Sequence, residues 1–475
     1  MPKLIFIEPQ APNLHIFSQF TLPRLGSLIL STMAKQQGWQ VRVYFEQDLA
    51  IDWEDVRTAD LVAVSTITST APRAYAICDR VAAMGIPAII GGPHVTFLPQ
   101  EALQHARFVM LGEAEISFAA FLKAFPDRAF HSVPSLCFME QGRMVQTERC
   151  AAVCDLDQLP FPDFSVLASP LRRLAGKKII PMQTSRGCPY DCAFCSVTGM
   201  FGRKYRFRSR ENILAELERY NSPDNYIFFY DDNFAAHPRR TRELLNGMIE
   251  RGITCHWSTQ VRADICKDLE MVRLMKQAGC HTVFVGFESV NPASLESMKK
   301  KQTIDDIQRA AVLLRRNGIQ VHGMFVYGFD DDDWQTVKAA VRFAKRTRLT
   351  STQFMILTPF PGTRSYEQLE QEDRIKFRDW SLYDAHHVVF KPRHFTFYAL
   401  QRAQLYSHRQ FYSIRESVKK LLQRRWIAVG LAHYARRLQA GWKKYNRKYL
   451  QVIRLLTPSK HEKVAIDYRK EIVLE

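Results

Sequence analysis

The chain has 475 residues and a formal net charge of +18, and 46% of its residues are hydrophobic. At about 150 residues per domain, this length predicts about three domains with ample material for buried cores. Aromatic residues make up 12% of the chain and charged residues 24%, so the composition excludes a mainly disordered protein. Most of the excess charge lies between Arg402 and Lys460, where fifteen Lys or Arg residues accompany one acidic residue, Glu416. Any inference from charge to a membrane or nucleic-acid partner therefore concerns the last quarter of the chain.

The N-terminus begins with a short apolar run that ends at Glu8 and Pro9, and it lacks the apolar stretch of a signal peptide. The sequence contains no run approaching the eighteen or so uncharged apolar residues of a membrane-spanning helix. We therefore expect a cytoplasmic protein. In a reducing compartment its ten cysteines are expected to be thiols or metal ligands rather than disulfides.

Residues 1–125 alternate short apolar strands with helical stretches. The alternation predicts an α/β fold with a doubly wound, Rossmann-like parallel sheet, because parallel neighbours need crossover connections. Residues 126–175 are predicted to form a linker with a small hairpin. The expected strands are Lys3–Ile7, Gln40–Phe45, Leu61–Thr66, Pro87–Ile90 and Phe108–Leu111, the helices Leu22–Gln37, Ala71–Met84 and Glu115–Ala124, and the hairpin strands Ser135–Phe138 and Met144–Thr147.

Residues 176–385 resume the alternation with longer units. Six strand–helix units in about 200 residues predict a partial (β/α)6 barrel of the TIM type, with its active site at the carboxyl ends of the strands. Residues 386–475 are predicted to form a basic helical C-terminal domain. The expected barrel strands are Lys178–Gln183, Tyr226–Tyr230, Thr254–Val261, Thr282–Phe287, Gln320–Val326 and Ser351–Leu357, and the helices Asn212–Tyr220, Arg239–Arg251, Leu269–Gln277, Ile304–Asn317 and Trp334–Thr347.

Three cysteines, Cys188, Cys192 and Cys195, follow the first barrel strand in the spacing C-x3-C-x2-C. Three thiolates on one short loop can hold three irons of a [4Fe-4S] cluster and leave the fourth iron open. A zinc site would need a fourth ligand, and the nearest histidine, His237, is far along the chain. Three thiols at chance spacing are the other alternative.

The loop from Ser185 to Ser196, with Phe194 just before its last cysteine, resembles the signature of the radical SAM superfamily. The resemblance covers residues of about 180–385. It implies a [4Fe-4S] cluster that binds S-adenosylmethionine and reduces it to a 5′-deoxyadenosyl radical, with Phe194 near the adenine. It also implies an external electron donor of the ferredoxin or flavodoxin type.

Polar segments at the other predicted strand ends resemble those of the cobalamin-associated branch of this superfamily. By analogy, Asp232, Gln260, Arg262 and Glu288 would contact the methionyl or ribose groups of S-adenosylmethionine. A carboxylate suits ammonium and hydroxyl groups, and an arginine suits a carboxylate. For each residue a salt bridge within the barrel is the alternative. No catalytic residue is predicted beyond the cluster ligands.

Glycines and hydroxyl residues follow the third, fourth and fifth strands of the first predicted sheet, where doubly wound sheets bind ligands. Glycine lets a bulky ligand approach the backbone, and hydroxyls supply hydrogen bonds. Before a radical SAM barrel, this domain resembles the cobalamin-binding domain of the same branch. The resemblance implies cobalamin contacts from Ser65, Thr66, Thr68, Gly91, Gly92, Pro93 and Glu113.

The first loop of this domain departs from cobalamin domains of the methionine-synthase type. Their Asp-x-His-x-x-Gly motif, which supplies the lower cobalt ligand, is missing here. Bound cobalamin is therefore expected to lack a motif-derived histidine ligand. His15 and His94 are the candidates to replace that ligand, but we expect them to be solvent-facing loop residues. A degenerate domain that no longer binds cobalamin stays an alternative.

The resemblance extends to the domain order, which is shared with methylases of hopanoids and other isoprenoid lipids and with a porphyrin-ring cyclase. It implies a cobalamin-dependent radical SAM methyltransferase acting on an unactivated carbon of a lipophilic small molecule, such as a hopanoid or isoprenoid. The radical would abstract hydrogen, and methylcobalamin would supply the methyl group. A radical oxidoreductase or cyclase that acts on a porphyrin or lipid without methyl transfer is the alternative. A non-catalytic binding module is disfavoured.

The C-terminal segment interleaves basic residues with aromatic residues such as Trp426 and Trp442. Such a basic amphipathic helix suits the surface of an anionic membrane, so we expect peripheral contact at the inner face of the membrane. The alternative is a helical cap on the barrel with a solvated basic face. Nucleic-acid binding is disfavoured, because the sequence contains no recognisable RNA module.

Overall fold

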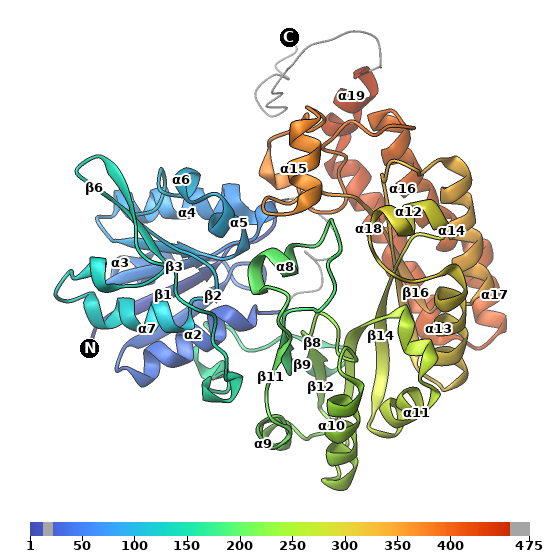
Figure 1. The fold of residues 1–475 in the computed structure, drawn as a ribbon, viewed down its shortest axis with the longest axis horizontal. Helices are drawn as coiled ribbons and strands as arrows, with labels where there is room; N and C mark the ends of the chain where they lie inside the picture. The colour runs from blue at the N-terminus through green and yellow to red at the C-terminus, as the bar shows by residue number, and fades with distance from the viewer. Residues whose placement is uncertain (13–21, 457–475) are drawn as a thin grey trace. The chain divides into compact units, whose positions relative to one another are not determined.

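The computed structural model describes residues 1–12 and 22–456. The chain divides into two compact units (Figure 1). The described part of the first unit consists of Met1–Pro12, residues 22–189 and Ser196–Tyr230. That of the second unit consists of Tyr190–Cys195 and residues 231–456. His15 lies outside the described residues.

The first sheet is doubly wound, as the sequence predicts. Its strand order is β2-β1-β3-β4-β5-β6-β7, in which the first five strands are parallel and the last two form an antiparallel hairpin. The hairpin lies within the segment predicted as a linker and extends this sheet. The strands are β1 (Lys3–Glu8), β2 (Gln40–Phe45), β3 (Leu61–Ser65), β4 (Ala88–Gly91), β5 (Phe108–Met110), β6 (Leu136–Glu140) and β7 (Arg143–Gln146).

Three longer helices follow β1, β3 and β5 of the first sheet and agree with the predicted ones. Three short helices were not expected from the sequence, because one turn or so of helix carries no apolar periodicity. Their starts are nevertheless encoded locally: the Asp52 side chain caps one of them, and proline opens the other two. The helices are α2 (Leu25–Gln36), α3 (Trp53–Arg57), α4 (Ala71–Ala83), α5 (Pro93–Phe97), α6 (Pro99–Ala102) and α7 (Glu115–Ala124).

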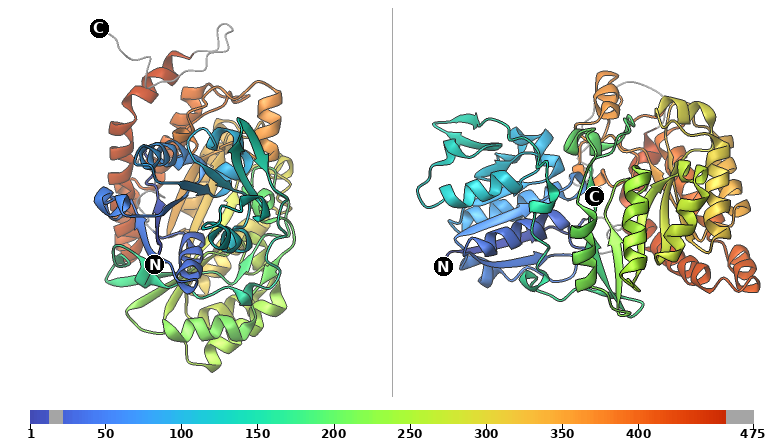
Figure 2. Two further views of the ribbon diagram at one scale, coloured as in Figure 1. Left: turned by 90° about the vertical axis from the view of Figure 1, so that its left-hand side faces the viewer. Right: turned by 60° about the horizontal axis from the view of Figure 1, so that its bottom comes forward.

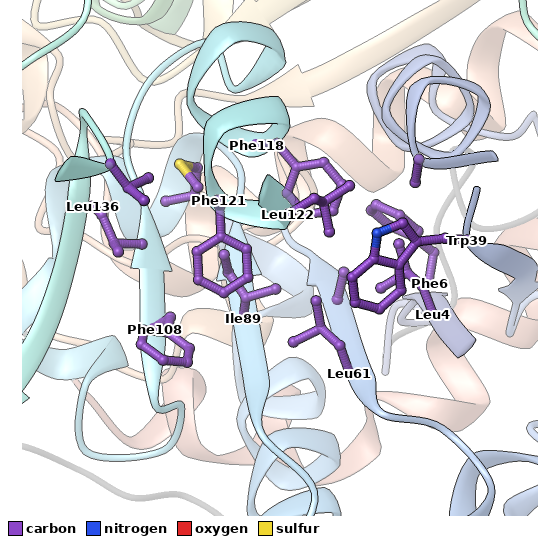
Figure 3. Packing of buried hydrophobic residues seen from close by; sticks show 14 of the residues in the cluster. Leu4, Phe6, Trp39, Leu61, Ile89, Phe108, Phe118, Phe121, Leu122 and Leu136 are labelled. Carbon is purple, nitrogen blue, oxygen red and sulfur yellow. The ribbon is translucent and has the colours of Figure 1, made fainter. Parts of the chain in front are cut away.

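Aromatic side chains dominate the core between α7 and the first sheet (Figure 3). Phe118 of α7 meets Phe6 of β1 edge to face, with ring centroids 5.5 Å apart. Phe121 meets Phe108 of β5 in the same way at 5.1 Å. Burying each such ring stabilises the fold by about 1.5–3 kcal/mol, so α7 fixes the position of the loop that precedes it.

The second sheet is the curled, partial-barrel sheet that the sequence predicts, with strand order β16-β15-β14-β13-β12-β9-β8. Strands β13 to β16 are parallel neighbours, as are β9 and β12. Strand β8 is antiparallel to β9, and β10 and β11 form a separate short pair. The strands are β8 (Arg173–Leu174), β9 (Lys177–Met182), β10 (Ser185–Arg186), β11 (Arg206–Phe207), β12 (Asn225–Phe229), β13 (His256–Arg262), β14 (Cys280–Glu288), β15 (Gln320–Tyr327) and β16 (Ser351–Ile356).

The helices associated with this sheet begin at clear capping residues. Thr303 and Asp333 each form a capping box at the start of α13 and α14. Five of these helices agree with the predicted ones, and α8, α12 and α15 are short additions. The helices are α8 (Ser196–Phe201), α9 (Arg210–Arg219), α10 (Pro238–Glu250), α11 (Leu269–Gln277), α12 (Pro292–Ser297), α13 (Ile304–Arg316), α14 (Trp334–Arg346) and α15 (Arg364–Gln371).

Four helices, α16 (Phe397–Phe411), α17 (Ile414–Leu422), α18 (Trp426–Tyr445) and α19 (Arg447–Leu455), form the C-terminal part of the second unit. Helix α16 packs along the edge strand β16 and contacts α14, α18 and α19. Figure 2 shows these C-terminal helices in orange to red. The Tyr412 hydroxyl accepts a hydrogen bond from the Thr352 amide at 2.8 Å and donates one to its carbonyl at 2.7 Å. This side chain therefore pairs with backbone groups that β16 would otherwise present to another strand.

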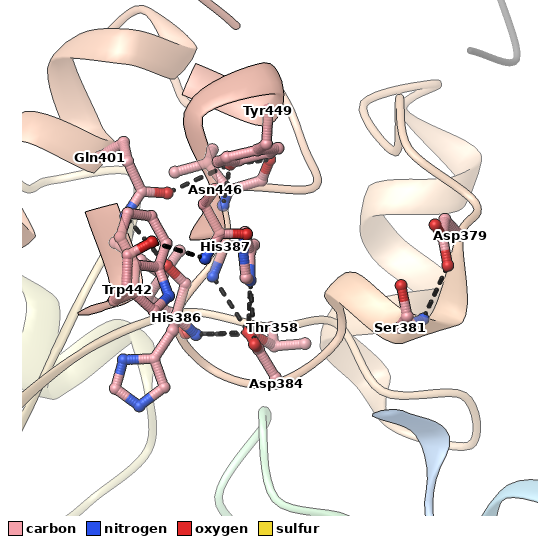
Figure 4. Close-up of polar contacts among 12 residues, drawn as sticks. Thr358, Asp379, Ser381, Asp384, His386, His387, Gln401, Trp442, Asn446 and Tyr449 are labelled. Carbon is pink, nitrogen blue, oxygen red and sulfur yellow. Dashed lines mark hydrogen bonds and ion pairs between the residues drawn. The ribbon is translucent and has the colours of Figure 1, made fainter. Parts of the chain in front are cut away.

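A buried polar cluster connects the C-terminal helices to the segment before them (Figure 4). His387 Nδ1 lies 2.9 Å from both Asp384 carboxylate oxygens, and its Nε2 lies 2.9 Å from Asn446 Oδ1. The Tyr449 hydroxyl bonds the backbone of Val388. Helix α19 is therefore held by polar contacts as well as by apolar packing. No helix in the described chain is long and apolar enough to cross a membrane.

Candidate functional site

The cysteine loop begins in the β10–β11 pair and runs into α8. Gly187 has a φ of +82°, and a Cβ there would lie 2.8 Å from the Lys204 carbonyl oxygen, so only glycine fits. The three cysteines that follow, Cys188, Cys192 and Cys195, are half-buried thiols. Within residues 1–12 and 22–456, no three His, Cys, Asp or Glu side chains lie close enough together to hold a metal ion. The donor set still fits a cluster, because three accessible thiols on one short loop are ligands that iron–sulfur clusters take.

Within the second unit, two other segments hold the middle of this loop. Arg364 donates to the Asp191 carboxylate at 3.0 Å and to its carbonyl at 2.6 Å. The Ala193 amide donates to the Met298 carbonyl at 3.3 Å, and the Ala193 carbonyl accepts from the Ser365 amide at 3.1 Å. These contacts fix the chain on both sides of the second cysteine, Cys192.

Phe194, predicted to lie near the adenine, meets Phe329 edge to face with ring centroids 5.9 Å apart. Two residues before Cys192, the Tyr190 hydroxyl donates to Asp264 at 2.8 Å. Hydrogen bonding and burial together raise the pKa of Tyr190 to about 12, with burial the larger cause. Tyr190 therefore acts as a neutral hydrogen-bond donor.

The four residues predicted to bind S-adenosylmethionine lie at or after the carboxyl ends of strands, as expected. Gln260 and Arg262 are on β13, Glu288 ends β14, and Asp232 follows β12. The Arg262 guanidinium lies 3.6 Å from the centre of the Tyr190 ring and donates to the Lys300 carbonyl. Stacking and hydrogen bonding together orient it.

The two carboxylates among these residues have different surroundings. Glu288 has a φ of +58° at an irregularity between β14 and β15, and its Oε1 accepts from the buried Lys300 ammonium at 2.7 Å. Asp232 is half-buried, and burial together with the neighbouring Asp231 raises the pKa of Asp232 to about 7. A raised carboxyl pKa beside a strand end is typical of a functional site.

The residues predicted to contact cobalamin gather at the carboxyl edge of the first sheet. Thr66 is buried, with its hydroxyl 2.9 Å from that of Thr70. Gly92 has a φ of +113°, and a Cβ there would overlap the Thr66 carbonyl, so close packing of two loops explains this glycine. Ser65 ends β3 and Thr68 follows it, and Gly91 and Pro93 flank Gly92. Hydroxyls and backbone at this edge fit the amide-rich periphery of a corrinoid.

Glu113, the remaining predicted cobalamin contact, is buried between two arginines. Its carboxylate accepts from Arg186 at 2.8 Å and from Arg206 at 3.0 Å. Arg186 also pairs with Glu115 at 2.6 Å. Because Arg186 immediately precedes Gly187, this ion-pair cluster anchors the start of the cysteine loop.

His94 does not face solvent as the sequence analysis expects. It is 1% exposed within α5, and its Nε2 lies 3.5 Å from Glu101. The expectation was wrong because α5, which buries the ring, is too short to be recognised from periodicity.

Comparisons with known proteins agree with this arrangement. Residues 182–344 match the family model of the radical SAM superfamily, and residues 17–122 match that of the B12 binding domain. The chain is 30% identical over 345 residues to the bacteriochlorophyllide d C-12(1)-methyltransferase of Chlorobaculum tepidum, covering 72% of each chain. The chain belongs to the cobalamin-dependent radical SAM methyltransferase family. The cofactors of this family are a [4Fe-4S] cluster, S-adenosylmethionine and cobalamin.

Two further relatives and a solved structure broaden the comparison. The chain is 26% identical over 367 residues to the hopanoid C-2 methylase of Rhodopseudomonas palustris, covering 75% of this chain and 66% of that one. It is 26% identical over 372 residues to the anaerobic magnesium-protoporphyrin IX monomethyl ester cyclase of Cereibacter sphaeroides, covering 74% and 60%. The cobalamin-dependent S-adenosylmethionine radical enzyme OxsB has the same fold, with a TM-score of 0.67 over 98% of this chain and 77% of that one at 16% identity.

In this radical SAM methyltransferase, sequence reasoning missed the residues that support the predicted ones. They are Tyr190 and Lys300 in the second unit and Arg186 and Arg206 in the first. The position of Arg186 directly before the cysteine loop was an available signal. Lys300 lies in a run of three lysines, which is typical of a solvated surface. The sequence therefore contains no sign that Lys300 is buried and paired with Glu288.

Proposed function

We propose that this enzyme transfers a methyl group to an unactivated carbon of a lipophilic, polycyclic small molecule. The proposal rests on three features that occur together in this chain. It has the loop with Cys188, Cys192 and Cys195, it matches the B12 binding domain, and it is 30% identical to a bacteriochlorophyllide methyltransferase. The chain is more similar to that relative than to the hopanoid methylase, which favours a tetrapyrrole as the substrate. A hopanoid or isoprenoid is the second substrate class.

The residues at the strand ends have roles that follow from their chemistry. Arg262, fixed against Tyr190, suits a carboxylate. Burial and the neighbouring Asp231 raise the pKa of Asp232, and an ammonium group bound beside it would favour its ionised form. Together they would orient the two charged ends of an amino-acid moiety such as that of S-adenosylmethionine.

The three thiols Cys188, Cys192 and Cys195 would hold the [4Fe-4S] cluster, and the carboxyl edge of the first sheet would hold cobalamin. When bound, these groups supply hydrogen abstraction and a transferable methyl group. An external donor of the ferredoxin or flavodoxin type would supply the electron. The protein contributes orientation and exclusion of water, and no further catalytic residue is assigned.

The proposal is tested with the anaerobically reconstituted full chain, a reducing system and S-adenosylmethionine carrying a deuterated methyl group. Bacteriochlorophyllide d and a hopene-type triterpene are the two probes. We expect one probe to gain the deuterated methyl group, and S-adenosylhomocysteine and 5′-deoxyadenosine to form together, as measured by mass spectrometry. Formation of 5′-deoxyadenosine without labelled product or S-adenosylhomocysteine would instead identify an oxidoreductase or cyclase, the activity of the cyclase relative.

A matched cysteine variant separates loss of the cluster from loss of the fold. Replacing Cys188, Cys192 and Cys195 together with alanine should abolish both products. Cys266→Ala, which removes a half-buried thiol outside the loop, should leave them unchanged. Activity that survives the triple replacement would contradict the proposal.

A further inference from the structure

A basic pocket of about 450 Å³ opens to solvent where the end of α14 meets α17. Four basic residues line it from α14 and the turn after that helix: Arg342, Lys345, Arg346 and Arg348. Three more come from α17 and the residue before α18: Lys419, Lys420 and Arg425. These seven cations share the pocket with one carboxylate, so it carries a large positive surplus.

The single carboxylate does not offset that surplus. Glu416 lies 3.2 Å from Lys419 and 3.7 Å from Lys345. Arg425 donates to the carbonyls of Arg348 and Leu349 at 2.7 and 3.0 Å. The remaining positive charge has no acidic partner among the residues that line the pocket.

Lys420 is the most unusual residue of the pocket. It is 5% exposed, and its Nζ has no hydrogen-bond partner in the described chain, although it lies 4.2 Å from the centre of the Phe411 ring. Burial and the neighbouring Arg425 lower the pKa of Lys420 to about 8, with burial the larger cause. A buried ammonium without an acceptor is costly, and an anion in the pocket would remove that cost.

Helix α17 buries polar side chains and exposes apolar ones. It buries Ser417 and Lys420 and exposes Ile414, Val418 and Leu422, of which Leu422 is 79% exposed. A helix that packs only on a protein core exposes its polar face instead. The next residues continue the apolar surface, with Trp426 65% and Ile427 49% exposed. Exposed apolar side chains gathered this way mark an interaction site.

We propose that α17 and the start of α18 dock onto an anionic phospholipid bilayer, with Leu422 and Trp426 inserted and a lipid phosphate in the pocket beside Lys420. Cations next to an apolar helix face are what a bilayer surface requires, because the headgroups are anionic and the acyl region is apolar. The proposal does not rest on the proposed reaction, since docking is measured without turnover.

The test is flotation of the full chain at about 0.15 M salt with vesicles of phosphatidylcholine alone or with added phosphatidylglycerol. We expect binding only to the phosphatidylglycerol vesicles, with a blue shift in tryptophan emission that Trp426→Phe removes. Lys420→Met should lower binding about fivefold while the thermal midpoint stays the same or rises. Leu422→Ser combined with Trp426→Ser should lower it about tenfold or more.

Two matched controls accompany these variants. Lys443→Gln with Lys444→Gln removes exposed charge from the far end of α18, and Ile249→Ser removes an exposed apolar side chain from α10. Both should bind vesicles as the parent chain does. Equal binding to both vesicle types, or binding unaffected by Lys420→Met, would overturn the proposal.

Other occupants of this surface would give different results. If glycerol 1-phosphate binds in the pocket and vesicles do not, the site serves a soluble anion. If the parent chain is a dimer that Leu422→Ser with Trp426→Ser dissociates, the surface joins two copies. If an oligonucleotide binds and vesicles do not, the partner is a nucleic acid. Each of these results overturns the membrane assignment.

Discussion

Two histidines, the buried His322 of β15 and the half-buried His408 of α16, are held neutral by their surroundings. His322 Nδ1 lies 2.8 Å from the Ser351 hydroxyl, and His408 Nε2 lies 3.3 Å from the Phe354 carbonyl. Burial lowers the pKa of each to about 4. Both therefore bind a proton more weakly in the folded protein than in the unfolded chain.

This difference makes stability depend on pH in a defined direction. Above pH 6.5 both states are unprotonated at these sites, and the full stability is present. As pH falls from 6.5 to 4 the unfolded chain gains protons first. Each of the two histidines therefore lowers the free energy of unfolding by about 3 kcal/mol over this range. Urea denaturation at pH 7 and pH 4.5 should show a larger loss in the parent chain than in a His322→Gln, His408→Gln variant.

The exposed His131 provides the control for this measurement. His131→Gln should keep the parent's dependence on pH, because its side chain is 64% exposed. An equal loss of stability in the parent and the double variant would mean that other groups cause the acid sensitivity.

At the scale of single residues, functional residues could be predicted from the sequence where they lie close together along the chain. The cysteine loop is recognisable because its three thiols lie within eight residues. The partners of Glu113, by contrast, come from residues more than 70 positions away. Such pairings depend on which loops the fold brings together, and no short pattern records them.

At the scale of elements, β16 depends on side chains of α16 and the residues that follow it. The Tyr412 hydroxyl bonds both backbone groups of Thr352, and Gln404 donates to the Phe354 carbonyl at 3.1 Å. The Ile356 amide donates to the Ala385 carbonyl at 2.8 Å. The outward-facing groups of the strand are therefore satisfied without a neighbouring strand.

Removing one hydroxyl tests this arrangement. Tyr412→Phe should lower the free energy of unfolding by about 1–3 kcal/mol, because it leaves a buried amide and carbonyl without partners. Hydrogen exchange at the Thr352 amide should become faster. Tyr445→Phe changes an exposed tyrosine of α18 and should have no measurable effect. Unchanged exchange at Thr352 in the Tyr412 variant would contradict this role.

The long elements were predictable because they repeat a pattern over several turns or residues. Strand β2 and helices α7 and α11 have the predicted bounds, and the other long elements of the two sheets differ by up to three residues at an end. Helices such as α3, α5 and α12 are too short for such a repeat, so only the structure shows them. The hairpin β6–β7 was predicted as a pair, but its addition to the first sheet depends on pairing with β5.

At the scale of the whole molecule, the two family matches lie on separate stretches of chain. We therefore expect the cluster and cobalamin to load independently. The triple replacement of Cys188, Cys192 and Cys195 with alanine should remove bound iron and keep cobalamin. Ser65→Ala with Thr68→Val should weaken cobalamin binding and keep iron. Iron assay and the corrinoid absorption bands of anaerobically purified protein measure both.

Two results would contradict these predictions for iron and cobalamin binding. If the cysteine replacements also abolish cobalamin binding while the thermal midpoint is unchanged, the two sites are coupled. Retention of normal cobalamin affinity in the Ser65 and Thr68 variant would show that these hydroxyls do not contact the corrinoid.

The satisfied edge of β16 also limits how this enzyme can recognise other molecules. Extended peptides often bind by adding a strand to a free sheet edge, where backbone hydrogen bonds provide affinity for many sequences. Tyr412, Gln404 and Ala385 already occupy that position along β16. The β16 edge therefore cannot pair with an extended peptide or with a strand of a second copy. Any molecule that binds along β16 must be recognised by side chains.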